Sequence, residues 1–346
     1  MATYDIVFGS LGLREWCDAG KAGGDRPMSM AELLAKSKGQ ESIEVSLWEF
    51  PFPSLDALNK ACANFPQSRD VTAGVEKSFL AIKDVLRFVL DPMTQPLSWI
   101  LETTLAGFKF TPWWVVIPIL MAIVYLASKS CKLVIFVTTC LTFLSIIDHY
   151  NHAIQTLAII FVCAFLCVLF GVPIGIAMSR SNAMQRITIP ILDMLQTLPP
   201  FVYLIPLIFL FSVTEPKLYG IAIILYAIVP VIRLTDLGIR LVDKDVIEAA
   251  DSFGMTDRQK LFGVQIPLAL PNIMAGINQT IMMSLAMVVI ASLVSAPGLG
   301  VLVLRGIRNL ELGVGLTSGL GIVLLAIILD RVTKAALHRI NASQNH

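Results

Sequence analysis

Charged residues are scarce in this chain, and their scarcity excludes most classes of soluble protein. Only 15% of the 346 residues are Asp, Glu, Lys or Arg, whereas a soluble domain has about 25%. The formal net charge is +1 and no run of five basic residues occurs, so nothing indicates a nucleic-acid partner. Because 56% of the residues are hydrophobic, the composition predicts a membrane protein.

Motifs for catalysis, nucleotide binding and metal binding are also missing. The sequence has no GxxxxGK[ST] loop, so the chain is not expected to bind ATP in that manner. Its four histidines form no cluster with metal-ligand spacing, and its six cysteines include no CxxC pair. No catalytic set of Ser, His and Asp or of Cys and His can be assembled across the apolar runs. We therefore expect no enzyme activity, no metal and no cofactor in this chain.

The N-terminal part of the chain is polar. Residues 1–74 lack the basic and apolar regions of a cleaved signal peptide. Cys17 and Cys62 could pair only if this region is extracytoplasmic. Residues 75–112 are different, because they contain two apolar pieces, separated near Pro96, that are too short and too charged to span a membrane. We expect two amphipathic helices there, at the membrane surface or packed on the bundle.

A transmembrane domain is predicted over residues 113–334, followed by a tail at 335–346. Seven apolar runs predict an all-α polytopic protein with about seven transmembrane helices. A full crossing needs about 20 residues, so the first, second and fourth runs are short, and the first pair is alternatively a re-entrant hairpin. The runs are 113–127, 133–147, 154–178, 198–213, 218–235, 276–300 and 314–330.

The distribution of lysine and arginine predicts the orientation, because cytoplasmic loops carry the excess of basic residues. Alternate loops on one side are rich in them, whereas the other side has three, Lys217, Arg305 and Arg308. The basic set is Lys129, Lys132, Arg180, Arg186, Arg233, Arg240, Lys244, Arg258, Lys260, Arg331, Lys334 and Arg339. The N-terminus is therefore expected outside and the C-terminus inside, and the loop 237–275 is the longest cytoplasmic one.

Within this loop the sequence predicts two short helices joined at a glycine. Asp243 is a favourable N-cap for the first helix, and Gly254 lies where a left-handed C-cap is expected. Thr256 begins a capping-box sequence that can start the second helix. Pro267 and Pro271 are expected to end that helix.

The same loop carries a resemblance to a known family. Glu248-Ala249-Ala250, then Gly254, and finally Val264, Ile266 and Pro267 resemble the EAA loop of ABC-importer permeases. The family pattern is EAA, three residues, Gly, nine residues and Ile-x-Leu-Pro, from which this loop departs only at the aliphatic positions. The resemblance implies a type I ABC-importer permease (MetI-like) architecture. It also implies that these seven residues couple the chain to a separate ATPase subunit, which binds ATP and Mg²⁺.

Further stretches are similar to the glycine betaine/proline permeases of osmoprotectant uptake. They are the run from Gln196 to Pro206, Gly276 to Thr280 with the span that follows, and the segment around Gly298. The resemblance covers roughly residues 75–335. It implies a homodimer in the bacterial inner membrane with two ATPase subunits and a periplasmic solute-binding protein. The implied solute is a small quaternary or methylated amine of the glycine betaine, proline, choline or trimethylamine N-oxide class.

Polar and aromatic residues in the fourth and sixth runs are candidates for a translocation path. Intramembrane polar residues often mark substrate paths, but they also serve hydrogen bonds between packed helices. Aromatic rings can bind a quaternary ammonium through cation–π contacts, although many only pack. Ser284, Ser292 and Ser295 are expected on one helical face, and Gly298 and Gly300 as an outer gate with non-helical backbone. The path candidates are Gln196, Phe201, Tyr203, Asn278, Gln279, Thr280, Ser284, Ser292 and Ser295.

Two alternatives from other classes stay open. An ion-coupled secondary transporter predicts inverted repeats and ionisable groups at mid-membrane, and neither is evident in the sequence. A membrane-anchored osmosensing receptor predicts that residues 1–74 are the working part of the protein.

Overall fold

The computed structural model describes residues 12, 17, 54–62 and 64–344, and within them the secondary structure is helical, with no strand. The chain forms two units, 1–85 and 86–346. In the first unit, which includes helix α4 (Leu55–Ala61), Cys17 and Cys62 form a disulfide whose two side chains are buried. The two cysteines are therefore paired. The sequence analysis expected this pairing only if the N-terminal region is extracytoplasmic.

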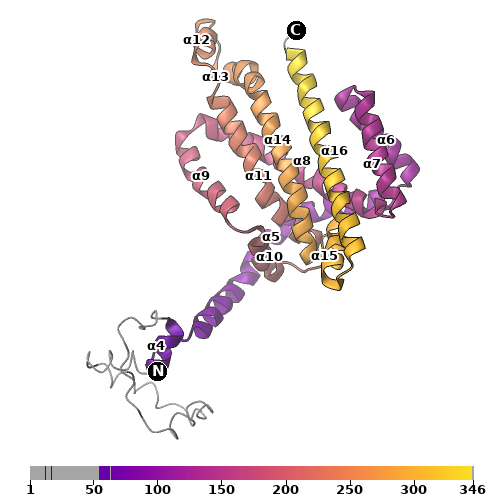
Figure 1. The fold of residues 1–346 in the computed structure, drawn as a ribbon. Coiled ribbons are helices and arrows are strands. Elements are labelled where there is room, and N and C mark those ends of the chain that lie inside the picture. Colours follow the sequence, from indigo (N-terminus) through magenta and orange to yellow (C-terminus); the bar gives the residue numbers. More distant parts are fainter. Residues whose placement is uncertain (1–11, 13–16, 18–53, 63, 345–346) are drawn as a thin grey trace, which may run out of the picture. The chain divides into compact units, whose positions relative to one another are not determined.

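The helices of the second unit follow one another with short connections (Figure 1). After α5 (Ser68–Phe110), which crosses the boundary between the units, they are α6 (Trp113–Ser128), α7 (Cys131–Ile146), α8 (Tyr150–Arg180), α9 (Asn182–Thr197), the 3-10 helix η2 (Pro200–Tyr203), α10 (Leu204–Leu210), α11 (Pro216–Arg240), α12 (Lys244–Ser252), α13 (Asp257–Lys260), the π-helical segment η3 (Leu261–Gln265), α14 (Ile266–Ala291), the 3-10 helix η4 (Ser292–Val294), α15 (Leu299–Asn309) and α16 (Leu312–Gln344).

Helix α5 corrects the expectation of two amphipathic helices before the first span. It is one helix that contains both Pro92 and Pro96. A proline inside a helix removes a backbone hydrogen bond and costs about 3 kcal/mol. Packing beyond the prolines opposes this cost, because Leu101 lies directly over Gly220 of α11, where an added Cβ would come within 2.7 Å of the leucine Cδ1.

The prediction of seven separate spans is higher than the structure supports. Among the described residues, four helices are long and apolar enough to cross a membrane alone: α8, α11, the run Asp257–Val294 and the part Leu312–Arg339 of α16. The number reaches six if two bent pairs each count as one span, α5 with α6 (bend 116°) and α9 with the helices of Pro200–Leu210 (bend 103°).

Three of the seven runs are not long enough helices to cross a membrane alone. Helices α6 and α7 have 16 residues each, so each measures about 24 Å at 1.5 Å per residue, less than the hydrocarbon thickness of about 30 Å. The fourth run is broken at its start, because Leu198 and Pro199 are extended and α10 has only seven residues.

The core of the second unit is built from α8, α11 and α14, which run side by side in Figure 1. Small residues let these backbones approach closely. A Cβ added at Gly175 of α8 would lie 2.7 Å from the carbonyl oxygen of Ile232, and one at Gly276 of α14 would lie 3.1 Å from the Cα of Val231. The central helix α11 is therefore in backbone contact with both neighbours.

Pro267 and Pro271 do not end the second loop helix, contrary to the sequence prediction. The chain from Asp257 to Val294 continues as one helical run, in which Pro267 lies in the first turn of α14 and Pro271 inside it. A proline clashes with the carbonyl four residues earlier. For Pro267 that residue is Gly263, which lies in the π-helical segment η3, where the wider turn relieves the clash.

The end of α14 corrects two further expectations. Helix α14 stops at Ala291, and Ser295 lies beyond it in a left-handed conformation (φ 86°), so the three serines do not share one helical face. Gly298 has φ 127°, which confirms a non-helical backbone there. Gly300 instead lies in the first turn of α15. The missing side chain of Gly300 allows α15 to pack closely on Ser292, because an added Cβ would come 2.3 Å from Ser292 Oγ.

Candidate functional site

The predicted helix pair between α11 and α14 is present, and its ends are capped as the sequence predicted. Asp243 accepts a hydrogen bond from the Asp245 backbone at the start of α12. Gly254 has φ +75°, and the amides of Gly254 and Met255 donate to the carbonyls of Asp251 and Ala250 in a Schellman arrangement. Because the termini satisfy their own backbone groups, this turn has a defined shape at the surface.

The second helix of the pair begins with the predicted capping box. Thr256 Oγ1 accepts from the Gln259 amide, and the Gln259 side chain accepts from the Thr256 amide at 2.8 Å. Lys260 joins the two helices, because its Nζ lies 2.5 Å from an Asp251 oxygen on α12 and 3.2 Å from an Asp257 oxygen on α13. The two helices therefore form one connected body.

This body is attached to two spans. Arg180, the last residue of α8, lies 3.5 Å from the carbonyl oxygen and 3.9 Å from the carboxylate of Asp257. Through η3 the pair continues into α14, and Ile266 packs on the cluster of Ile239, Ala269 and Ile273. The helix pair is therefore continuous with α14 and in polar contact with the end of α8.

The outer surface of the helix pair is open and carries large exposed aromatic side chains. A cavity of about 580 Å³ is lined by Phe253, Gly254, Met255, Gln259, Phe262 and Gly263. The side chains of Phe253 and Phe262 are 86% and 67% exposed, which is unusual for large aromatic residues at a polar loop. Glu248 and Ala249 are exposed as well, whereas Ala250 is buried against the pair. Within residues 64–344, the Glu248 carboxylate has no ion-pair partner.

Of the remaining predicted coupling residues, Val264 and Pro267 are half-buried in η3 and in the first turn of α14. They lie on the connection to the span and not on the open surface. The aromatic residues of this surface were missed, because the family pattern leaves their positions unspecified.

A polar network that the sequence did not reveal lies at the same end of the bundle. The buried Asp236 accepts hydrogen bonds from Gln185 Nε2 at 2.7 Å and from Arg240 Nε at 2.8 Å. Arg240 also donates to Asn182 Oδ1 and to the carbonyl oxygen of Met178. The network ties the start of α9 to α8 and α11, and its members are too far apart in sequence for a motif to show.

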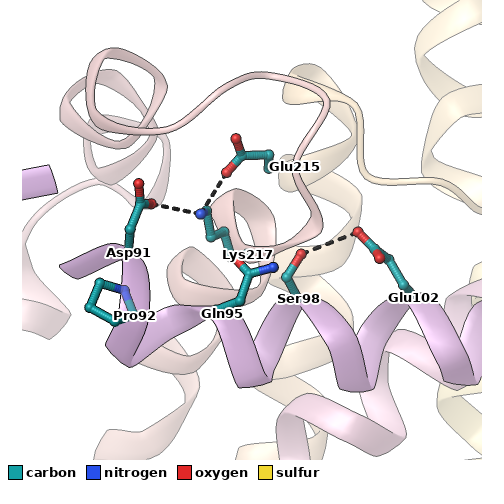
Figure 2. Close-up of a pocket in the computed structure, with 7 residues that line it drawn as sticks. All are labelled: Asp91, Pro92, Gln95, Ser98, Glu102, Glu215 and Lys217. Atoms are coloured by element: carbon teal, nitrogen blue, oxygen red, sulfur yellow. Dashed lines mark hydrogen bonds and ion pairs between the residues drawn. The ribbon is translucent and has the colours of Figure 1, made fainter. Parts of the chain in front are cut away.

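A second unpredicted cluster joins α5 to the beginning of α11 (Figure 2). Lys217 is only 5% exposed, and its Nζ lies 2.7 Å from both Asp91 and Glu215. The hydrogen bond from this ammonium lowers the pKa of the Asp91 carboxyl. Glu102 and Ser98, which are hydrogen-bonded to each other, line the same cavity of about 450 Å³. The sequence identified Lys217 only as a basic residue of the outer loops.

Four of the path candidates carry buried polar atoms that lack a hydrogen-bond partner within the described residues. They are the hydroxyls of Tyr203, Thr280 and Ser284 and the Oδ1 of Asn278. Buried polar groups are normally paired. Thr280 and Ser284 lie one turn apart on α14, and η2, which carries Tyr203, packs on the same helix. Among the residues that sequence reasoning missed, Thr235 of α11 has an unpartnered hydroxyl too.

The other path candidates do not join this group. Phe201 is 55% exposed, Gln279 is exposed and Gln196 is half-buried. Ser292 donates to the carbonyl oxygen of Val288, and Ser295 donates to the carbonyl oxygen of Val213.

The gate candidate Gly298 packs tightly on α8. A Cβ there would lie 2.3 Å from Thr156 Oγ1, and the same hydroxyl accepts a hydrogen bond from the Leu299 amide at 2.9 Å. The segment between α14 and α15 is thus fixed to α8.

Together, the fold and the loop define a class: a helical membrane protein with a capped, exposed helix pair continuous with one of its spans. The family model "Binding-protein-dependent transport system inner membrane component" matches residues 168–342, which is half of the chain. The chain belongs to this family. The matched part begins within α8 and includes both the helix pair and the path candidates.

Curated relatives are permease proteins of transport systems. The chain is 49% identical over 190 residues to the glycine betaine/proline betaine transport system permease protein ProW of Escherichia coli. The aligned region covers 55% of this chain and 53% of that protein. It is 41% identical over 227 residues to the glycine betaine/carnitine transport permease protein GbuB of Listeria monocytogenes, covering 65% and 80%. The chain thus spans about half the length of the first of these relatives.

A solved structure shares the fold. The inward-facing MetNI methionine ABC transporter contains a chain that superimposes with a TM-score of 0.50 at 20% identity, covering 56% of this chain and 95% of its own length. This likeness confirms the MetI-like architecture that the EAA resemblance implied.

Proposed function

We propose that this chain is the permease subunit of a binding-protein-dependent ABC importer for a small quaternary or methylated amine. It forms the translocation pathway in the bacterial inner membrane and itself binds no cofactor. A separate ATPase subunit binds ATP and Mg²⁺ and supplies the energy.

The exposed face of the α12–α13 pair carries this proposal. The pair is capped at both helix starts and held together by Lys260, yet Glu248 and two aromatic side chains stay open to solvent. A rigid body with an open cavity and exposed aromatic side chains suits docking into a partner protein. Because the body continues into α14, movement of the ATPase subunits tilts the span that carries Thr280 and Ser284.

The assembly requires two copies of the permease, two ATPase subunits and an extracytoplasmic solute-binding protein. The proposed orientation has the N-terminal region outside and the C-terminus in the cytoplasm. The Cys17–Cys62 disulfide supports it, because disulfides persist in oxidising compartments. The loop that holds the helix pair is also rich in lysine and arginine, as cytoplasmic loops are.

The solute class follows from the relatives, which are named for glycine betaine, proline betaine and carnitine. We propose that Thr280 and Ser284, with Tyr203, line the path of such a solute. Their unpartnered hydroxyls support this assignment, since buried polar groups without protein partners suit water or a passing polar solute.

The test is solute uptake and ATP hydrolysis by the reconstituted complex with Glu248→Lys or Gly254→Asp in the permease. We expect both variants to insert at normal levels while uptake falls at least tenfold and solute no longer stimulates ATP hydrolysis. Lys244→Glu, a charge change of equal size and opposite sign at an exposed position of the same helix, serves as the control and should retain uptake.

Wild-type uptake by both loop variants would contradict the docking assignment. Uptake that persists without the ATPase subunits, but is lost when residues 1–74 are removed, would instead favour one of the other classes of membrane protein.

A further inference from the structure

A basic pocket at the end of the bundle has no role in the proposed transport mechanism. Its volume is about 580 Å³, and it lies between the first turns of α7 and the C-terminal part of α16. Figure 1 shows that this part of α16 lies at the same end as α12 and α13. The lining residues are Ser130, Lys132, Leu133, Phe136, Asp330, Arg331, Lys334, Ala335 and His338.

The pocket has an excess of positive charge. Three cations, on Lys132, Arg331 and Lys334, line it together with one carboxylate, that of Asp330. That carboxylate is already engaged, because one oxygen lies 2.7 Å from Lys334 Nζ and the other accepts from Asn278 Nδ2 at 3.2 Å. Within residues 64–344, neither Lys132 nor Arg331 has a carboxylate at ion-pair distance.

One wall of the pocket is apolar. Leu133 and Phe136 of α7 form it together with Ala335 of α16, and the guanidinium of Arg331 lies over the Phe136 ring at 5.4 Å. The contact places the arginine charge directly against the apolar wall. The pocket therefore offers cations with an apolar surface directly beside them.

We propose that this pocket binds the phosphate group of an anionic phospholipid. Phosphate is one of the anions that Lys and Arg side chains recognise in proteins, as carboxylate is. The apolar wall beside the cations matches the glycerol and acyl portion of a lipid, which free phosphate lacks. Basic pockets between helices at the cytoplasmic surface are the usual places for anionic headgroups. The inference rests on the proposed orientation, which makes this end cytoplasmic.

The test measures lipid binding to the purified full-length chain in a neutral detergent. Dioleoylphosphatidylglycerol, dioleoylphosphatidylcholine and inorganic phosphate are each titrated while native mass spectrometry or thermal stability is recorded. We expect the anionic lipid to bind and the other two to have little effect. The double variant Lys132→Gln with Arg331→Gln should weaken phosphatidylglycerol binding roughly 30-fold, which corresponds to about 2 kcal/mol.

Two comparison variants make the result specific. Arg186→Gln with Lys244→Gln removes two exposed cations, on α9 and α12, outside the pocket, and should bind the lipid like the unmodified chain. Lys132→Arg with Arg331→Lys keeps both charges and should bind within a few-fold. It also separates charge loss from misfolding if the glutamine variant is unstable.

Three results would overturn the proposal. The first is equal lipid binding by the glutamine double variant and the unmodified chain, and the second is equal binding of phosphatidylcholine. The third is displacement of the lipid by millimolar inorganic phosphate, which would assign the pocket to a soluble anion. None of these results depends on transport, so the proposed function is tested separately.

Discussion

The cluster around Lys217 allows a quantitative prediction about how α5 is held to the core. Replacing Lys217 by methionine keeps the apolar stem but leaves Asp91 and Glu215 facing each other without their shared cation (Figure 2). Breaking a fully buried ion pair from one side costs about 3–5 kcal/mol. Here the two carboxylates are 34% and 30% exposed, and Arg87 lies 3.1 Å from Asp91, so water and this arginine compensate in part. We expect a loss of about 2 kcal/mol.

A double-mutant cycle isolates the contribution of the pair. Asp91→Asn alone should cost about 1 kcal/mol, because Lys217 keeps Glu215 at 2.7 Å. In the double variant the neutral asparagine no longer repels Glu215. The double variant should therefore lose about 1 kcal/mol less stability than the sum of the losses in the two single variants.

The assay is the free energy of unfolding of the full-length chain in mixed micelles, titrated with sodium dodecyl sulfate. Arg87→Gln serves as the control, because this arginine is 44% exposed and exposed pairs contribute less than about 1 kcal/mol. Strict additivity of the two substitutions, or a cost for Lys217→Met no larger than for Arg87→Gln, would refute the reasoning.

Three further predictions concern the core, the path and the disulfide. Gly175→Ala should lower the free energy of unfolding by about 1–3 kcal/mol, because the new Cβ would meet Thr235 Cβ at 2.6 Å. Gly313→Ala is the control and should not lower this free energy, because nothing lies within 4 Å of a Cβ added there. Equal losses in the two variants would contradict the close packing at Gly175. Ser284→Ala should leave the stability within about 0.5 kcal/mol, because its hydroxyl has no hydrogen-bond partner in the described part of the chain, while solute uptake falls. Unchanged uptake would remove this residue from the path. Cys17 should resist alkylation in intact cells until a reductant is added, and labelling without reductant would contradict the disulfide.

The sequence predicted the α12–α13 helix pair closely because its structure is local. The N-cap at Asp243, the left-handed Gly254 and the capping box at Thr256 each depend on residues within about four positions. Such contacts form wherever the right side chains occur at the right spacing. The open Phe253 and Phe262 could be located only in the structure, because exposure depends on what packs around the loop.

Longer-range features could not be predicted in the same way. The network of Asp236 with Gln185 joins residues 51 positions apart, and the pair of Lys217 with Asp91 joins residues 126 positions apart. No spacing in the sequence distinguishes these carboxylates from other surface acids, because their partners arrive only when the helices pack.

The sequence by itself determined the class of this protein, a helical membrane protein with a capped helix pair between two of its spans, since composition, hydrophobic run length and capping spacing are properties of nearby residues. The tertiary structure decided which runs are complete spans and where helices end. Proline illustrates the difference. Local rules predicted that Pro267 and Pro271 end a helix, but the π-helical turn and the packing of Ile266 on α11 and α14 carry the helix through both. A packed helix face outweighs the loss of one or two backbone hydrogen bonds, and that face exists only after the bundle has formed.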